Sequence, residues 1–472
     1  MGGVNGKMVR LLSFDDAYSP TTTVANTMSI LDAHQVFALI GYAGTPTASA
    51  VFNLVGERTV PFVGPLTGAG FLRATDQNHI INIRASYSDE CAAMVKYLKA
   101  RNHTRIAFFG QADGFGAAGY NGLRAALRYH RMELHSAGYY PKGTTAVHQG
   151  VLDILGQDEL PDAIVMFGTA RPLAVFTALL KIGSVRGLDL EKFRVMAVSF
   201  AGAIAFRDAL MNAVSDVTTT PPEGYLRNVF MTQVVPVPTD RTNALVNEYQ
   251  ADLDATYGVQ DTLKTFESLE GWMVGRLSVM ALQRSASTTR EAFVDAFYST
   301  QFFQAATDST PLGPYQVNQC NQGSRVVYVS ELGADPNVLS TNPGSYEIRE
   351  TYDFSELDCG VTREYADRTC EDGFERISLS EDTLEFRCER CIRGSASSNG
   401  APCLTCPGGH YSPDDGEAEC IPCPPGYFQD RPGQGSCLPC DIYSYAAGTN
   451  HTSCQACGEN ALAFFEASTS RD

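Results

Sequence analysis

Three segments in the first part of the chain share one pattern, an apolar run followed by a glycine turn and a hydroxyl side chain. The first is Phe37-Ala-Leu-Ile-Gly-Tyr-Ala-Gly-Thr-Pro-Thr-Ala-Ser-Ala-Val51, and the others cover residues 60–70 and 80–89. Each segment predicts a buried strand, a tight turn and the first residues of a helix. Three strand ends of this kind fit an open α/β sheet, which binds ligands beyond the carboxyl ends of its strands.

The hydroxyl side chains at the first strand end are candidate ligand contacts. Thr45 and Thr47 follow the glycine turn, where a helix start leaves N–H groups unpaired and carries positive dipole charge. A hydroxyl beside such a start can bind a carboxylate. For this segment alone, capping of the helix by its own threonine is the favoured interpretation.

Strand and helix patterns alternate through much of the remaining chain. Strands are predicted at residues 9–16, 105–110, 163–167, 194–199 and 228–235, and helices at 20–31, 90–98, 114–127, 172–182 and 267–282. This alternation predicts a parallel sheet with right-handed crossovers. Cys91 lies inside one of the helical patterns, where we interpret it as a small buried hydrophobic residue.

The segments FALIGYAGTPT, VPFVGPLTGAGFLR and NIRASYSDE resemble the first lobe of the periplasmic-binding-protein type I family. The similarity is greatest to branched-chain amino-acid-binding proteins and to receptor ligand-binding regions built from them. It extends from about Gly3 to Leu332 and implies a two-lobed α/β fold, with parallel sheets flanked by helices. The family's opening strand-helix unit has no counterpart here, and we therefore expect the chain to be a fragment of a longer protein.

The resemblance also implies a domain organisation. Residues 1–352 are expected to form the two-lobed ligand-binding domain and residues 353–387 a linker. Lobe 1 is expected to use residues 1–103 and 236–310 and lobe 2 residues 104–235, with closing segments at 311–352 and a closing hairpin formed by 312–317 and 325–330.

The remaining region, residues 388–472, is dominated by cysteine. Cys-x-x-Cys recurs at 388/391, 403/406, 420/423, 437/440 and 454/457, so the repeats are 15, 17, 17 and 17 residues apart. The apolar content is too low for a core, and cross-links are expected to hold the region together. Zinc binding is one alternative. The loops resemble ephrin-receptor-like cysteine-rich repeats of extracellular proteins, which favours disulfides.

The two cysteines of one pair lie too close together to bond comfortably to each other, so we expect partners from adjacent repeats. The simplest ladder is Cys391–Cys403, Cys406–Cys420, Cys423–Cys437 and Cys440–Cys454. Cys388 would then pair upstream, with Cys370 as a candidate, and Cys457 would need a partner beyond the given chain. Asn102 and Asn450 begin glycosylation sequons, which also suit an extracellular protein.

The family resemblance assigns candidate ligand contacts to both lobes. In lobe 1, Thr45 matches the residue that holds a ligand carboxylate, and the next turn and the cleft wall supply Leu66, Thr67, Gly68, Tyr42 and Tyr87. In lobe 2, Phe115 matches an aromatic residue that closes over the ligand, and Ala170 or Arg171 lies in the next loop. Ser199 stands where amino-acid-binding members keep an acidic residue for the ligand's ammonium group. This departure puts an α-amino-acid ligand in doubt, and Arg171 favours an acidic or amide ligand.

Composition and motifs narrow the function further. Of the net charge of −18, the part of the chain from Asp353 onward carries −13, because it contains 21 acidic residues and 8 arginines but no lysine. Nucleic acid is therefore not an expected partner. No catalytic constellation, metal spacing or phosphate loop is recognisable, and we expect neither enzyme activity nor a cofactor. The chain has no apolar run of about eighteen residues and no signal peptide.

We therefore expect a receptor ectodomain on the extracellular side of a membrane. Its binding domain would close on a small polar molecule, amino-acid-like or an organic acid, and relay the change through a cysteine-rich stalk. Membrane attachment would come from segments absent from this sequence, and a homodimer is a further expectation. Two alternatives are a substrate-binding protein of an ABC-type transporter and an adhesive or structural ectodomain that binds no ligand.

Overall fold

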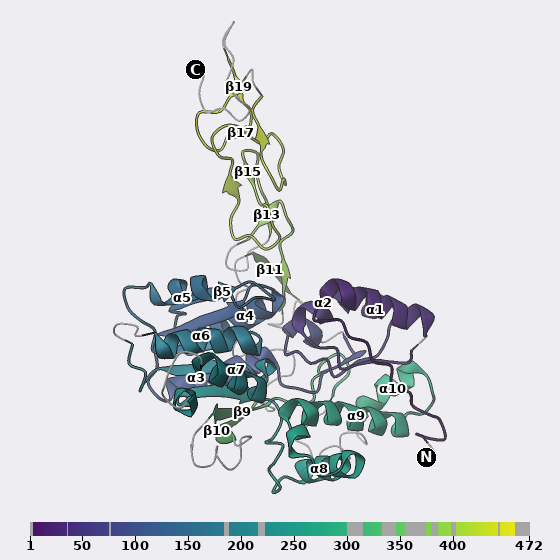
Figure 1. The fold of residues 1–472 in the computed structure, drawn as a ribbon. Coiled ribbons are helices and arrows are strands. Elements are labelled where there is room, and N and C mark those ends of the chain that lie inside the picture. The colour runs from purple at the N-terminus through teal and green to yellow at the C-terminus, as the bar shows by residue number, and fades with distance from the viewer. Residues whose placement is uncertain are drawn as a thin grey trace. The chain divides into compact units, whose positions relative to one another are not determined.

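The computed structural model describes residues 3–34, 36–74, 77–183, 188–215, 222–299, 315–332, 346–354, 373–378, 386–397, 403–441 and 444–457. The chain divides into two compact units, Met1–Tyr365 and Ala366–Asp472 (Figure 1). All helices of the described residues and both larger sheets belong to the first unit, whereas the second is built from short strand pairs.

The first sheet is small and parallel. Its strands are β1 (Leu39–Ile40), β2 (Phe62–Val63) and β3 (Ile80–Ile81), in that order. Helices α1 (Pro20–Ala33) and α2 (Thr45–Glu57) pack together and share an apolar core with these strands. The sequence predicts all five elements, since each apolar run is followed by a turn and a helix start. Helix α1 begins at Pro20, and the side chain of Ser19 accepts a hydrogen bond from Thr22 N.

The second sheet has the strand order β10-β9-β8-β7-β6-β4-β5. Strands β5, β4, β6, β7 and β8 run parallel, whereas β9 is antiparallel to β8 and β10 is antiparallel to β9. The bounds are β4 (Ile106–Gln111), β5 (Ser136–Tyr140), β6 (Ala163–Phe167), β7 (Arg194–Ala197), β8 (Val229–Gln233), β9 (Val326–Leu332) and β10 (Tyr346–Asp353).

Helices cover both faces of the second sheet (Figure 1). Strand β4 shows why, because Phe108 and Phe109 are both fully buried on opposite faces. Phe108 packs on Tyr120 of α4, and Phe109 stacks on Phe176 of α6 with ring centroids 3.9 Å apart. The helices are α3 (Tyr87–Lys99), α4 (Gly114–Tyr129), α5 (His148–Leu155), α6 (Ala170–Ile182) and α7 (Ala203–Ser215).

Three helices follow β8. They are α8 (Ala244–Tyr257), α9 (Phe266–Arg284) and α10 (Arg290–Phe297). Val274 and Leu277 of α9 share one apolar cluster with Val63 and Ile81 of the first sheet. The chain thus returns to the first sheet after β8, before β9 and β10 complete the second. Helix α3 contacts mainly α4 and β9, which favours a lobe boundary earlier than His103, although the division of the chain between lobes remains a prediction.

Two sequence-based predictions need correction. Residues 9–16 do not form the predicted strand: Val9 and Leu11 are exposed, and no strand among the described residues lies beside them to complete a ladder. The expected closing hairpin also differs, since β9 pairs with β10 rather than with residues 312–317. Residues 312–314 of that segment lie outside the described part of the chain, and Gln316 forms only an isolated bridge with Cys320.

The second unit consists of disulfide-linked hairpins. After the pair β11 (Phe374–Ser378) and β12 (Phe386–Arg390), two-residue strands pair antiparallel as β13–β14, β15–β16, β17–β18 and β19–β20. The bounds of these strands are Ser395–Ala396, Leu404–Thr405, His410–Tyr411, Ile421–Pro422, Tyr427–Phe428, Leu438–Pro439, Ser444–Tyr445 and Gln455–Ala456.

The structure contains the disulfides Cys391–Cys403, Cys406–Cys420, Cys423–Cys437 and Cys440–Cys454, which is the ladder expected from the sequence. These four pairs are therefore not zinc ligands. Cys320 and Cys388 are also disulfide-bonded, while Cys370, the candidate partner of Cys388, lies outside the described residues. The thiols of Cys91 and Cys457 are free, and Cys91 is fully buried as expected.

Two further features bear on membrane insertion and on glycosylation. None of the helices in the described part of the chain is long and apolar enough to cross a membrane. Asn102 and Asn450, the first residues of the two sequons, are both exposed and have positive φ angles. Their glycosylation remains a prediction.

Candidate functional site

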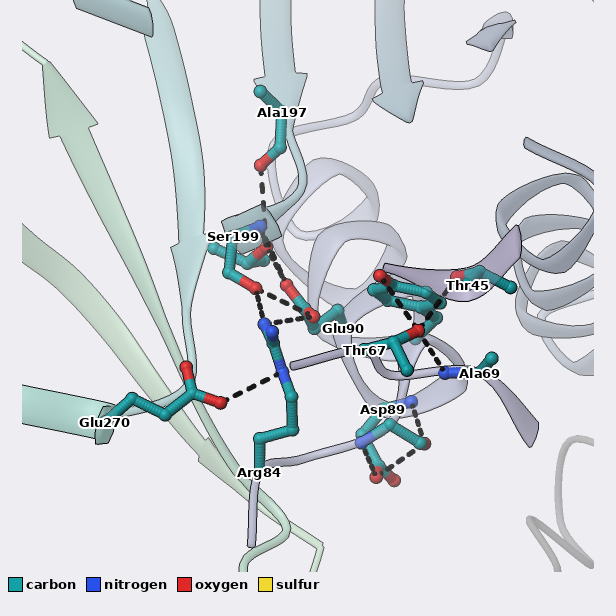
Figure 2. Close-up of polar contacts among 12 residues, drawn as sticks. Thr45, Thr67, Ala69, Arg84, Asp89, Glu90, Ala197, Ser199 and Glu270 are labelled. Atoms are coloured by element: carbon teal, nitrogen blue, oxygen red, sulfur yellow. Dashed lines mark hydrogen bonds and ion pairs between the residues drawn. The ribbon is translucent and has the colours of Figure 1, made fainter. Parts of the chain in front are cut away.

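Three hydroxyl side chains meet where the first sheet ends. Thr45 is the first residue of α2, and Thr67 and Tyr87 follow β2 and β3. The Oγ1 atoms of Thr45 and Thr67 lie 2.8 Å apart, and Thr67 Oγ1 donates to the Tyr87 hydroxyl at 3.4 Å (Figure 2). All three side chains are buried, and burial raises the pKa of Tyr87 although Arg84 and Thr67 oppose that shift. The trio is a polar cluster that forms its own hydrogen bonds inside the protein.

A glycine makes this arrangement possible. A methyl group at Gly68 would lie 2.5 Å from the Tyr87 ring and 2.6 Å from its backbone nitrogen, so only glycine fits beside that helix start. Tyr87 N donates to Gly68 O at 2.8 Å. The turn after β2 is therefore fixed against the beginning of α3.

A second polar cluster joins the two sheets. Its centre is the fully buried carboxylate of Glu90 on α3, which accepts hydrogen bonds from Ser199 N and Ser199 Oγ at 3.0 Å each and from Thr232 Oγ1. Arg84, which follows β3, donates to Ser199 Oγ and lies 3.7 Å from Glu90 Oε1 (Figure 2). Ser199, at the carboxyl end of β7, therefore contacts both the guanidinium of Arg84, which follows the first sheet, and the carboxylate of Glu90.

Glu270 of α9 is the other acidic neighbour of Arg84. Its Oε1 lies 3.7 Å from Arg84 Nε, on the side away from Ser199 (Figure 2). Burial raises the pKa of Glu270, Arg84 opposes this shift, and Glu90 and Glu267 reinforce it. Burial alone would lower the pKa of Arg84, but Glu270 and Glu90 outweigh that effect and raise it. Arg84 is therefore shared between Glu270 and Glu90, and Arg73 is a second guanidinium whose charge acts on Glu270.

A cavity lies beside these charged groups. The empty space in this region, counted together with adjoining open solvent, is about 310 Å³. Elements of both sheets and the segment between them line it: Leu66, Arg84, Ser199, Phe200, Gln233, Val234, Val235, Phe266, Glu267 and Glu270. A position at the carboxyl ends of parallel strands is where α/β proteins of this kind bind ligands.

The structure brings only some of the predicted ligand contacts to this cavity. Leu66 and Ser199 line it, and Thr45, Thr67, Gly68 and Tyr87 form the adjacent cluster. The other four predicted contacts do not line the cavity: Tyr42, Thr47, Phe115 and Arg171.

Each of these four has a structural setting of its own. The Tyr42 hydroxyl bonds to Thr27 of α1 at 2.8 Å, and Thr47 Oγ1 donates to the carbonyl of Gly44 at 2.9 Å, as a residue in the first helical turn often does. Phe115 is fully buried and packs on Phe200 with ring centroids 4.9 Å apart, so it supports a cavity wall from behind. Arg171 is exposed on α6.

Sequence reasoning missed the charged residues of the site. Arg84, Glu90 and Glu270 lie inside segments whose patterns predict a strand and two helices. These patterns predict the secondary structure of the three residues but not their role in the site. One signal was present for Glu270: it falls on the same helical face as Phe266, Leu269, Met273 and Val274, all buried. A carboxylate on an apolar helix face requires a buried partner.

The fold and this cavity between two α/β sheets define a ligand-binding protein. The profile of the periplasmic binding protein family matches residues 1–336, and the chain belongs to this family. The profile described as tyrosine-protein kinase ephrin type A/B receptor-like matches residues 394–434 and 412–457 in the cysteine-rich unit. No curated protein shows significant similarity to the chain.

Solved structures agree with this assignment. A possible leucine/isoleucine/valine-binding protein from Rhodopirellula baltica is 29% identical, with a TM-score of 0.60 over 73% of this chain and 86% of that one. A substrate-binding periplasmic protein from Ralstonia solanacearum is 24% identical, with a TM-score of 0.58 over 70% and 88%. An ABC-transporter solute-binding protein from R. palustris, in complex with benzoate, is 13% identical, with a TM-score of 0.60 over 76% and 90%.

Proposed function

We propose that this chain is the extracellular ligand-binding region of a receptor. Its first unit would bind a small polar molecule in the cavity between the two sheets and close around it by a hinge motion. Family members and structural neighbours are binding proteins rather than enzymes. One neighbour is named as a possible leucine/isoleucine/valine-binding protein, and another is in complex with benzoate.

The observation that carries the proposal is the lining of the cavity. Leu66 and Arg84 come from the first sheet, Ser199 and Phe200 follow β7 of the second, and Glu270 belongs to the helix that returns to the first. A ligand that contacts all three segments would stabilise the closed arrangement over an open one. The Thr45 hydroxyl, next to the helix start of α2, remains our proposed contact for an acceptor group of the ligand.

The cysteine-rich unit supports the receptor proposal. Disulfide ladders persist in oxidising surroundings, which suits an extracellular or periplasmic location. A protein that only shuttles a ligand has no evident need for such repeats, whereas a receptor can use them to connect binding to a distant output. Attachment to a membrane and formation of a homodimer are part of this proposal.

A substrate-binding role in an ABC-type transporter is the second candidate. It is supported by structural neighbours that are named as transporter components. Cell fractionation separates the two: the receptor proposal expects the native protein in the membrane fraction, and a shuttle is expected free in the extracytoplasmic fluid.

Ligand binding itself is tested by filling the cavity. Compounds of several classes, among them branched aliphatic amino acids, aromatic carboxylates, amides and amines, are screened for an increase in the thermal unfolding midpoint. We expect at least one class to raise the midpoint of the wild type but not of Leu66→Trp, because the indole would occupy the cavity. Leu152→Trp, at a position 51% exposed on α5, is the matched control. A screen without any stabilising class, or an effect that survives Leu66→Trp, contradicts the proposal.

A further inference from the structure

The charges that surround the cavity do not balance. The side chains that line it include two carboxylates, those of Glu267 and Glu270, and one guanidinium, that of Arg84. Arg84 is only 2% exposed and is already shared between Glu90 and Glu270, with both carboxylates at 3.7 Å. Among the side chains that line the cavity, one negative charge therefore remains without a counterion.

Glu267 is the carboxylate with the greatest freedom to meet a ligand. It is exposed, although it lines the cavity, whereas Glu270 is buried and forms an ion pair with Arg84. A methyl group added at Gly202 would lie 3.1 Å from Glu267 Oε1, so this carboxylate reaches from α9 to the residue that precedes α7. Glu267 therefore lies between α9 and the residue before α7, two segments that would approach each other on closure.

A second, independent observation points to a bound molecule. Gln233 is 2% exposed and lines the cavity, yet its Nε2 atom has no hydrogen-bond partner among the described residues. The same holds for Arg84 Nε, apart from its ion pair with Glu270. A buried donor without an acceptor is destabilising, so both groups are suited to a ligand that brings an acceptor oxygen.

We propose that the cavity selects a small monocation, an aliphatic amine that also carries a neutral acceptor such as an amide carbonyl. Its ammonium group would lie between Glu267 and Glu270, and its carbonyl oxygen would accept from Gln233 Nε2. Its aliphatic part would pack on the apolar walls, to which Phe200, Val234 and Phe266 contribute. This inference rests on the proposed function and names the ligand class for the same cavity.

Charge explains why the cavity would prefer such a cation over anionic or neutral compounds of the same shape. A carboxylate-bearing ligand adds negative charge beside Glu267 and Glu270, and like charges at short range oppose binding. A neutral amide could satisfy Gln233 but would bring no cation to Glu267, and Glu270 would keep only its share of Arg84. The raised pKa of Glu270 agrees with this picture, because excess negative charge and burial both disfavour its ionised form.

The test uses four compounds that share one aliphatic skeleton. They are valinamide, valine, isovaleramide and isovalerate, which are cationic, zwitterionic, neutral and anionic at about pH 6.5. Calorimetric titration of the full chain is expected to show valinamide binding at least about tenfold more tightly than each of the others.

Variants then locate the interaction. Glu267→Gln keeps the size of the side chain and is expected to weaken valinamide binding by roughly tenfold while leaving isovaleramide unaffected. Glu57→Gln, at an exposed position on α2, is the matched control and should change neither. Gln233→Met removes the amide donor and should weaken valinamide and isovaleramide alike.

The possible results separate two failures. Equal or tighter binding of valine or isovalerate, or a Glu267→Gln variant with unchanged affinity for valinamide, overturns the inference and leaves the proposed function standing. The inference alone also falls if none of the four binds while another compound is excluded by Leu66→Trp. If no compound of any class binds, the proposed function falls with it.

Discussion

Thr67 is the residue on which the buried hydroxyl cluster depends. Its Oγ1 contacts the hydroxyls of Thr45 and Tyr87 and accepts from Ala69 N at 3.3 Å. Thr67→Val keeps the shape but leaves these groups without a partner, and we expect a loss of about 1–3 kcal/mol in the free energy of unfolding. Urea denaturation measures this, with Thr67→Ser as the control that keeps the hydroxyl. Equal stability of the two variants would contradict the role assigned to the cluster.

Glu270 makes the stability of the protein depend on pH. Its pKa in the folded state is raised above the ordinary 4.5, so the folded state binds the proton more tightly than the unfolded chain. Stability from this group is fully present below the unfolded pKa and is lost as pH rises through the folded one. Glu270→Gln cannot titrate, and its free energy of unfolding should fall less than that of the wild type as pH rises above 4.5. Denaturation at several pH values, with Glu57→Gln as control, checks this. Parallel pH profiles would refute it.

At the scale of structural elements, we predict that the loss of one disulfide affects mainly its own hairpin. Replacing both Cys423 and Cys437 with serine opens a loop that spans 14 positions, and the chain-entropy model assigns about 3 kcal/mol to a loop of that size. Because each repeat contacts mainly its neighbours, the effect should remain local. Hydrogen exchange should accelerate in peptides covering 423–437, while the more distant strand pair β11–β12 serves as an internal control. Loss of protection throughout the second unit would contradict this.

The elements also show how far sequence reasoning reaches. Ala163–Phe167 is predicted with the bounds of β6, because five consecutive apolar residues bounded by polar ones suit a strand buried on both faces. Residues 9–16 carry a similar local signal but form no strand, since a strand also requires a neighbour with which to pair, and the pattern does not report one. No bounds are predicted from the sequence for strands β5 and β10 or for helices α5, α7, α8 and α10.

The candidate site was less predictable than the fold for a related reason. Ser199 and Leu66 could be placed by family resemblance, because their positions follow from the strand ends. The partners of Arg84 come from α3 and α9, up to 186 positions away for Glu270, and depend on how helices from separate parts of the chain pack. No local pattern encodes that distance.

At the scale of the whole molecule, the two compact units are expected to unfold separately. A chain that ends at Tyr365 retains the first unit and both of its sheets. We expect its calorimetric transition to coincide with one transition of the full chain, and its affinity for any ligand of the cavity to be unchanged. A midpoint lowered by many degrees would show instead that the second unit stabilises the first.

The ladder of hairpins also has a mechanical consequence. Each of the four disulfides bridges a sequence separation of 12 or 14, and a pulling force applied to the ends of the unit cannot extend the chain inside those loops. Reduction of one such disulfide would release roughly 40–50 Å of contour length, at about 3.3–3.6 Å per residue. Under load, the oxidised second unit would therefore lengthen less than the same unit with a disulfide reduced.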